Sequence, residues 1–168
     1  MIVELMLVFG CGGTPMEQQI PVQQSRGYTI AVDTLGVDGI VVAPAARVWE
    51  VLTGVLTDLG LDINFREPAG RRVGTCYQKV RTRLGKELLS ALVDCGDNRG
   101  APNADRYEIA LTVISYVEST GATTSKLHTF VLGVALDASG ASSNRVWCYP
   151  KGVLEERIRT AVEERARG

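Results

Sequence analysis

The chain has 168 residues and carries 18 Lys and Arg against 19 Asp and Glu, so its formal net charge is -1 with its one His counted as neutral. This length is that of one ordinary domain, and the balanced charge gives no overall sign of nucleic-acid binding or of an acidic substrate. Hydrophobic residues make up 45% of the chain and charged residues 22%. These fractions are globular, and they exclude a disordered tail, a collagen and a protein with many membrane spans.

The most apolar run, MIVELMLVFG, occupies residues 1–10 and is followed directly by Cys11. As a helix it would be about 15 Å long, half of the roughly 30 Å hydrocarbon core of a bilayer, so it does not span a membrane alone. Its end, Val8-Phe9-Gly10-Cys11, resembles the signal box of bacterial lipoproteins, in which a small residue precedes a cysteine that becomes the acylated N-terminus. The resemblance implies a signal-like segment at 1–11 with lipid on Cys11, and the polar, Gln-rich residues 12–27 are then a flexible tether.

A second interpretation of this N-terminal run remains open. Glu4 interrupts the apolar residues, and no Lys or Arg precedes Arg26, whereas a secretion signal begins with a positive segment. In that interpretation residues 1–10 form a first buried strand and Cys11 is an ordinary core thiol.

Alternating apolar residues and turn residues predict a series of strands in the globular part, residues 28–168. The clearest alternation runs over residues 107–113, and a Ser-, Thr- and Gly-rich hairpin at 119–125 leads into a second long strand. A turn is expected at residues 36–39, between two short strands. In chain order the predicted strands are residues 28–34, 39–43, 62–66, 72–82, 107–113, 126–137 and 146–149.

Two amphipathic helices are predicted, one early in the domain and one at its C-terminal end. Pro44 suits a first helical turn, and apolar residues between 48 and 59 then recur at the spacing of one helix face until Gly60. The same spacing returns at residues 154–165, and a short helix or turn is expected at 87–92. The last helix is also expected to carry two i, i+4 ion pairs: Glu155–Arg159 and Glu163–Arg167.

Consecutive strands joined by short turns imply an antiparallel sheet, and the two helices are expected to cover one of its faces. The predicted fold class is α+β: a two-layer antiparallel sheet with a long early helix and a C-terminal helix on one face. This order of elements resembles the helix-grip arrangement. Together with Asp94-Cys95-Gly96, it is similar to the domains of small lipoproteins of the outer-membrane protein assembly machinery and to uncharacterised envelope lipoproteins. The resemblance covers about residues 40–165.

The chain contains four cysteines, and a lipid on Cys11 would leave an odd number for pairing. Cys95 lies in a turn-rich stretch and Cys148 in the last strand, so we predict a disulfide between them and a free, buried thiol at Cys76. Closing a loop of about 50 residues contributes roughly 4 kcal/mol on the chain-entropy model. The alternative is a reduced cytosolic protein with buried thiols. No C-x-x-C pair is present, which argues against a zinc site.

The sequence carries no constellation of catalytic residues. His128 is the single imidazole, and in a strand it is expected to face solvent or to satisfy a backbone partner. Asp94, Asp97, Asn98 and Asp105 have oxygen ligands to offer Ca²⁺, but they lack the spacing of an EF-hand and are interpreted as a solvated turn. No G-x-S-x-G, H-E-x-x-H, Walker or dinucleotide motif occurs. We therefore predict no catalytic residue, no metal site and no cofactor.

Residues 66–86 carry seven basic residues against one acidic residue, a local charge of +6 in an otherwise acidic chain. Tyr77, Lys79, Arg81 and Arg83 alternate along a predicted strand and are expected to project from one face. Such a row would contact anionic lipid headgroups or an acidic partner surface, at about 1 kcal/mol per basic residue near a charged membrane. A solvated outer face of the sheet is an equally good interpretation. Nucleic acid is not an expected partner.

Two functions are compatible with these observations. The first is a non-enzymatic periplasmic lipoprotein, an accessory or scaffold subunit of a membrane protein complex, anchored at the membrane by its N-terminal lipid. The host would be the outer-membrane assembly machinery, or an inner-membrane assembly such as a photosynthetic reaction-centre and antenna complex. The second is a small-ligand- or lipid-binding module, because a sheet that grips a long helix can leave an apolar pocket.

Overall fold

The structure is a computed structural model that describes residues 36–136 and 145–168. The predicted signal-like segment 1–11 with Cys11, the tether 12–27 and the strand 28–34 lie outside the described residues. In chain order the elements are β1(Gly36–Val41), α1(Ala45–Asp58), β2(Phe65–Glu67), β3(Arg72–Arg81), β4(Arg83–Leu84), β5(Glu87–Leu88), α2(Leu89–Leu92), β6(Val93–Asp94), β7(Asp97–Asn98), β8(Ala101–Pro102), the 3-10 turn η2(Asn103–Asp105), β9(Glu108–Ser119), β10(Ser125–Leu136), β11(Arg145–Pro150) and α3(Val153–Arg167).

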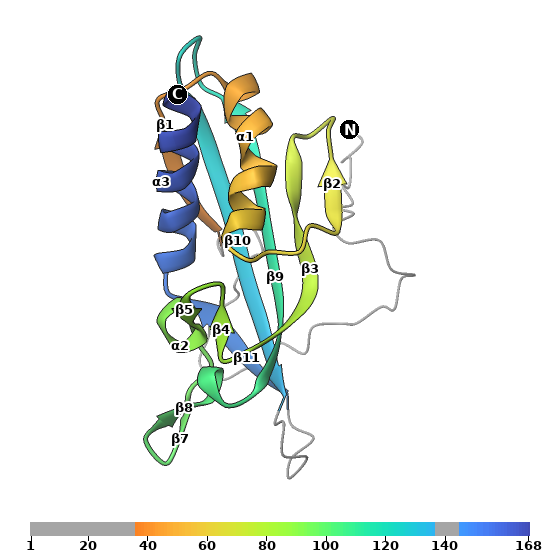
Figure 1. Cartoon of the computed structure of the whole chain (residues 1–168), viewed down its shortest axis with the longest axis vertical. Coiled ribbons are helices and arrows are strands. Elements are labelled where there is room, and N and C mark those ends of the chain that lie inside the picture. Colours follow the sequence, from red (N-terminus) through yellow and green to blue (C-terminus); the bar gives the residue numbers. More distant parts are fainter. Residues whose placement is uncertain (1–35, 137–144) are drawn as a thin grey trace, which may run out of the picture.

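The described part of the chain is an α+β domain with an antiparallel sheet, as predicted. Its centre is the long hairpin β9–β10, whose strands pair over their whole length from Ser119↔Ser125 to Glu108↔Leu136. β3 pairs with the other edge of β9, while β1 and β11 share the other edge of β10. Figure 1 shows α1 and α3 side by side on one face of this sheet.

The two long helices form where the apolar spacing predicts them. α1 begins after Pro44 and buries the side chains of its predicted face, and Gly60, with a positive φ of 91°, ends the helical stretch. α3 buries Leu154, Ile158 and Val162. Their apolar faces pack on the inward residues of β9 and β10 and so form one core. No helix within 36–136 or 145–168 has the length and apolar content needed to cross a bilayer.

The first described strand differs from the prediction. A turn was expected at residues 36–39, but Gly36–Val41 is one continuous strand paired with β10. Gly36, Asp38 and Gly39 are residue types that are common in turns, which is why the sequence of this segment alone predicts a turn. Pairing with the distant strand β10 fixes them in an extended conformation instead, because alternate residues of β1 then hydrogen-bond with β10 through their backbone groups.

A β-bulge interrupts β3 and decides which of its side chains face the helices. The register with β9 shifts between Thr75 and Gln78, and Tyr77 there has a positive φ of 56°. The Asn64 side chain holds the bulge, because it accepts a hydrogen bond from the Cys76 backbone N–H (2.7 Å) and donates one to the Cys76 carbonyl (3.0 Å). Since side chains alternate along a strand, the one extra residue of the bulge reverses the alternation and puts Lys79 and Arg81 on the face opposite the helices.

Candidate functional site

The sheet has a second face, on the side opposite α1 and α3, and we call it the outer face. On β9 and β10 every second residue is buried against the helices, so the residues between them point to the other side. These outward residues are half-buried and largely apolar on β10. The members of the outer face at its centre are Ala110, Thr112, Ile114, Phe130, Leu132, Val134 and, from β11, Trp147.

The apolar members of the outer face are cross-strand neighbours. Ile114 lies directly opposite Phe130, and Val134 lies between its partners Ala110 on β9 and Trp147 on β11. Side chains directly opposite each other on one face of a sheet are in contact range. The centre of the outer face is therefore a continuous apolar area rather than a set of scattered exposed side chains.

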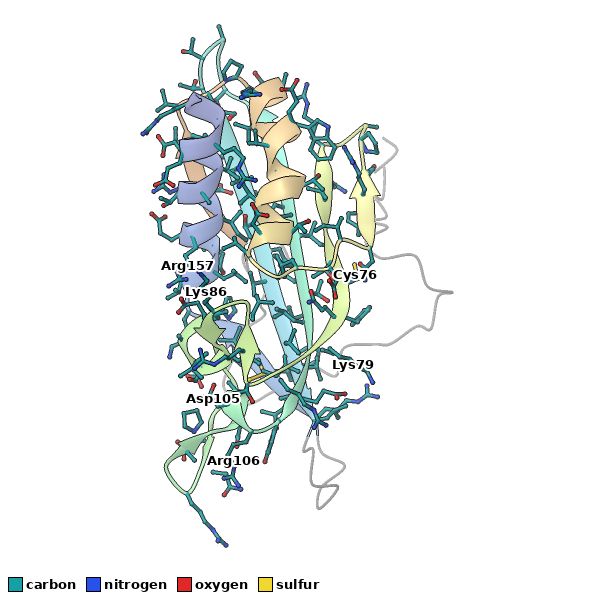
Figure 2. The ribbon with its side chains drawn as sticks, in the orientation of Figure 1. Cys76, Lys79, Lys86, Asp105, Arg106 and Arg157 are labelled. Atoms are coloured by element: carbon teal, nitrogen blue, oxygen red, sulfur yellow. A yellow bond between two sulfur atoms is a disulfide. The ribbon has the colours of Figure 1, made fainter. Side chains whose placement is uncertain are left out.

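The predicted basic row borders this apolar centre. Lys79 is the register partner of Ala110, and both Lys79 and Arg81 form ion pairs with Glu108, at 3.4 and 3.3 Å. Arg83 lies directly opposite Arg81 in the β3–β4 ladder and therefore shares its face. Figure 2 shows Lys79 projecting outward from β3. Exposed ion pairs are weak, so three bases around one acid leave a positive edge.

Tyr77, the fourth predicted member of this row, is 67% exposed at the bulge. Its backbone N–H donates to the Thr112 hydroxyl of the outer face at 3.2 Å. Lys79, Arg81 and Arg83 share one face through their register pairs, whereas Tyr77 lies inside the register shift, where no register pair places its side chain on that face. Whether they contact a partner stays a prediction.

The opposite end of the outer face carries a compact charged network. His128 and Asp38 are hydrogen-bonded through Nδ1 and Oδ1, and the His128 ring stacks on Tyr116 with centroids 4.6 Å apart. Lys126 forms ion pairs with Glu118 (3.2 Å) and Asp38 (3.3 Å), which raise the pKa of Lys126, while the hydrogen bond with His128 lowers the pKa of Asp38. His128 thus has a side-chain partner and fastens β1 to β10.

The Cys95–Cys148 disulfide is confirmed, with a sequence separation of 53 residues. Both cysteines are buried, and the bond links β11 to the loop that follows β6. The prediction for Cys76 is wrong, because Cys76 is half-buried and disulfide-bonded rather than a free, buried thiol. Its place in the β3 bulge brings it to the surface, whereas the sequence pattern implied a regular strand.

The acidic residues around the 94–105 loop serve the loop itself. Asp94 accepts a hydrogen bond from the Gly96 N–H at 2.8 Å, and Asp105 accepts from the backbone N–H and hydroxyl of Ser90 at 2.9 and 2.7 Å. Within the described residues, no group of three or more His, Cys, Asp or Glu is arranged to hold a metal ion.

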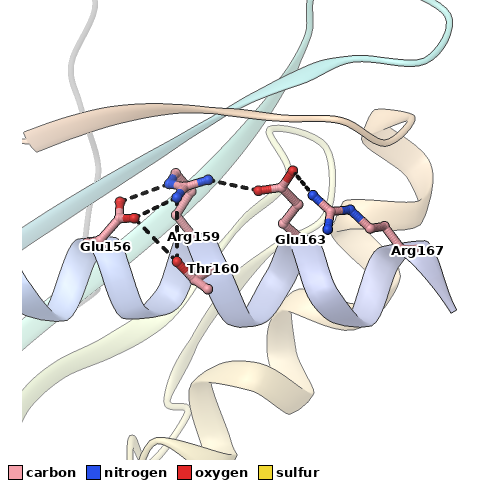
Figure 3. Close-up of polar contacts among 5 residues, drawn as sticks. All are labelled: Glu156, Arg159, Thr160, Glu163 and Arg167. Atoms are coloured by element: carbon pink, nitrogen blue, oxygen red, sulfur yellow. Dashed lines mark hydrogen bonds and ion pairs between the residues drawn. The ribbon is translucent and has the colours of Figure 1, made fainter.

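α3 holds one ion pair that was predicted and lacks the other. Glu163 pairs with Arg167, but Arg159 bonds to Glu156 and Glu163 instead of Glu155 (Figure 3). Glu155 is turned inward and is only 2% exposed, and neither carboxylate oxygen has a hydrogen-bond partner among the described residues. The spacing of Glu155 with Ile158 and Val162, i, i+3 and i+7, was the signal that places it on the buried face.

Burial raises the pKa of Glu155 above its ordinary value of 4.5, and its own backbone N–H opposes this shift only in part. The native state therefore holds this proton to higher pH than the unfolded chain, and stability falls as pH rises from about 4.5 through the raised pKa. Asp38 and Glu156 line the same cavity, but their hydrogen bonds to His128 and Arg159 lower their pKa values, so both titrate below this window.

We expect Glu155→Gln to raise the free energy of unfolding by about 1–2 kcal/mol at neutral pH, because it removes an unpaired buried charge. The gain should shrink toward about pH 4, where the wild-type carboxyl is protonated in both states. Urea unfolding of both proteins between about pH 4 and pH 8 measures this difference. A gain that is independent of pH would contradict the assignment of a buried, ionising carboxylate.

No family model, curated protein or solved structure matches the chain. A functional assignment therefore rests on the geometry of the chain itself. That geometry offers two features: the outer face with its basic edge, and the cavity beside Glu155.

Proposed function

We propose that this chain is a non-enzymatic accessory subunit of a membrane protein complex on the periplasmic side of a bacterial membrane, and that it docks through the outer face of its sheet. The observation that carries the proposal is the apolar centre of that face. An antiparallel sheet in a two-layer domain normally presents polar residues on the side without helices. Here β10 is apolar on both sides, with Phe130, Leu132 and Val134 pointing away from the helices.

The arrangement of charges around the apolar centre supports a protein partner. Docking surfaces commonly combine an apolar core with a polar rim, and the rim fixes orientation and partner choice. Lys79, Arg81 and Arg83 give the rim a positive side, so the matching surface would be apolar with acidic residues along one border. The proposal includes the helix-grip-like arrangement suggested by the order of elements, with the sheet holding α1.

The compartment is part of the proposal and is supported by the disulfides. Bonds at Cys95–Cys148 and at Cys76 are typical of proteins that fold outside the reducing cytosol. The sequence has one further cysteine, Cys11, the residue to which the lipoprotein resemblance assigns the lipid. A thioether-linked lipid and a disulfide to Cys76 would both need the Cys11 sulfur, so they exclude each other.

Peptide mapping without reduction decides the state of Cys11. An acyl-modified N-terminal peptide would support the lipid anchor. A cross-linked peptide pair containing Cys11 and Cys76 would overturn the anchor and leave docking through the outer face to be tested by itself.

Docking is tested by recovery of membrane proteins with the full chain in a mild-detergent pull-down from native membranes. We expect the variant Lys79→Glu/Arg81→Glu/Arg83→Glu to recover its partner at least tenfold less well, because three favourable contacts become repulsive. The matched control, Arg47→Glu/Arg157→Glu/Arg165→Glu, changes the net charge equally; these arginines lie on or beside the helices and also have acidic partners.

Apolar contact is tested in the same assay with Leu132→Ser on the outer face. Its control is Val42→Ser, at a residue that is 59% exposed between β1 and α1. Thermal melts establish that all four variants are folded. Equal recovery by the charge-reversal variant and its control, or full recovery by Leu132→Ser, would overturn the outer face as the docking surface.

A ligand-binding module is the second candidate function. It is favoured by one specific observation, the cavity beside Glu155.

A further inference from the structure

A cavity of about 230 Å³ lies between β1 and α3, on the helix side of the sheet. Its apolar wall is made by Val37 of β1 and Leu127 of β10, which lie on the helix side of the sheet. Glu155, from the first turn of α3, also lines it. The cavity is smaller than the roughly 300 Å³ at which pockets for drug-sized ligands begin, so it suits a small molecule.

Glu155 is the unusual member of this lining. A glutamate at the third position of a helix commonly accepts a hydrogen bond from the backbone N–H that precedes the helix. Glu155 does not, and its two carboxylate oxygens are buried without a hydrogen-bond partner among the described residues. Burial of an unpaired carboxylate is costly, so such a group marks a place where a partner is missing.

The neighbouring charges do not supply that partner. Arg159 is the one cation that lines the cavity in the described part of the chain, and its guanidinium is engaged by Glu156 at 2.5 and 2.8 Å and by Glu163 at 2.8 Å (Figure 3). Asp38, at the rim, is held by His128 and Lys126. Every other charged group of the cavity therefore has a partner of opposite charge, and the Glu155 carboxyl group is left without one.

We propose that this cavity binds a small organic ammonium compound, with its charged nitrogen on the Glu155 carboxylate and its alkyl part against Val37 and Leu127. The single uncompensated carboxylate calls for one positive charge with hydrogen-bond donors, which an ammonium group provides. The apolar wall favours an alkylammonium over a hydrated inorganic cation, because an inorganic ion would leave this wall in contact with water. The site lies on the opposite side of the sheet from the outer face, so it is independent of docking.

The test uses n-butylammonium as the probe and the full chain labelled with ¹⁵N. We expect saturable amide shifts confined to residues 37–40, 127–129 and 153–156. Glu155→Gln, which keeps the side-chain shape, should weaken the apparent affinity at least tenfold. The matched control, Glu164→Gln, is exposed on the same helix and should stay within twofold of wild type.

Three comparisons make the outcome decisive. n-Butanol and n-butyrate share the alkyl chain without the positive charge, and potassium chloride supplies a monovalent cation without the chain. Equal binding of any of these, unsaturable shifts, or unchanged affinity in Glu155→Gln would overturn the proposal. The charge-reversal variant at Lys79, Arg81 and Arg83 should bind n-butylammonium like wild type, so that failure of this site and failure of docking are seen separately.

Discussion

Replacing Cys95 and Cys148 together by alanine should lower the free energy of unfolding by about 2–5 kcal/mol, the range seen when a native disulfide is removed. The bond closes a loop with a sequence separation of 53 residues, so its loss gives the unfolded chain much more freedom. The pairing of β6 with β11 is short, with the two register pairs Tyr149↔Asp94 and Pro150↔Val93. Loss of the disulfide therefore puts few hydrogen bonds of the sheet at risk. The bond is thus the main covalent restraint on this corner.

Urea unfolding of the double variant measures the effect. The free energy of unfolding should fall more steeply with urea concentration, because the unfolded chain becomes more expanded. Wild type treated with reductant under unfolding conditions provides the comparison. If neither the double variant nor the reduced wild type is less stable, the bond contributes nothing and the oxidising compartment loses its main support. Hydrogen exchange should show the earliest loss of protection at residues 93–105, since the bond ties that segment to β11.

The parts of the fold that were predicted are those specified by nearby residues. α1 follows from Pro44, the apolar spacing and Gly60, and β9–β10 follows from two alternating segments around one turn-rich hairpin. These signals lie within a few residues of the element that they specify. The prediction of the Cys95–Cys148 bond also succeeded, with Cys95 in a loop and Cys148 in the last strand, although β11 pairs with β6 as well as β10 and is not the edge of the sheet.

The failures come from interactions between distant residues. β1 is a strand through Gly36–Gly39 because it pairs with β10, and Cys76 lies in a bulge because the Asn64 side chain holds both of its backbone groups. Arg159 turns to Glu156 and Glu163 once the packing of α3 buries Glu155. The pairing of β1 and the bulge at Cys76 are not visible in a local window of sequence, whereas the spacing of Glu155 with Ile158 and Val162 did signal its burial.

The candidate site was predicted in part. The alternation of Lys79, Arg81 and Arg83 indicated a shared face, but the bulge decides that this face is the one without helices. The apolar centre was overlooked although its signal was present. In 126–137 the apolar residues occupy both parities, as Val131 and Leu132 do, which is typical of a strand covered on both sides.

Gly74→Ala should be the most damaging single substitution in the sheet, lowering the free energy of unfolding by about 3 kcal/mol or more. A Cβ at this residue would lie 1.9 Å from the Val113 carbonyl oxygen and 2.8 Å from the Ile114 Cα. Both atoms belong to the backbone of β9, so no side-chain rotation relieves the clash. β3 would have to move away from β9, which breaks the ladder that also positions Lys79 and Arg81.

Gly54→Ala is the matched control for this substitution. It lies in α1, and its Cβ would lie 3.0 Å from the Arg165 Nη1, the far end of a flexible side chain. Alanine is the better helix former, so we expect a gain of about 0.5–1 kcal/mol in the free energy of unfolding. Urea unfolding distinguishes the two variants clearly. If Gly74→Ala were as stable as wild type, β3 would not lie this close to β9. That result would also contradict the position of the basic edge beside the apolar centre of the outer face.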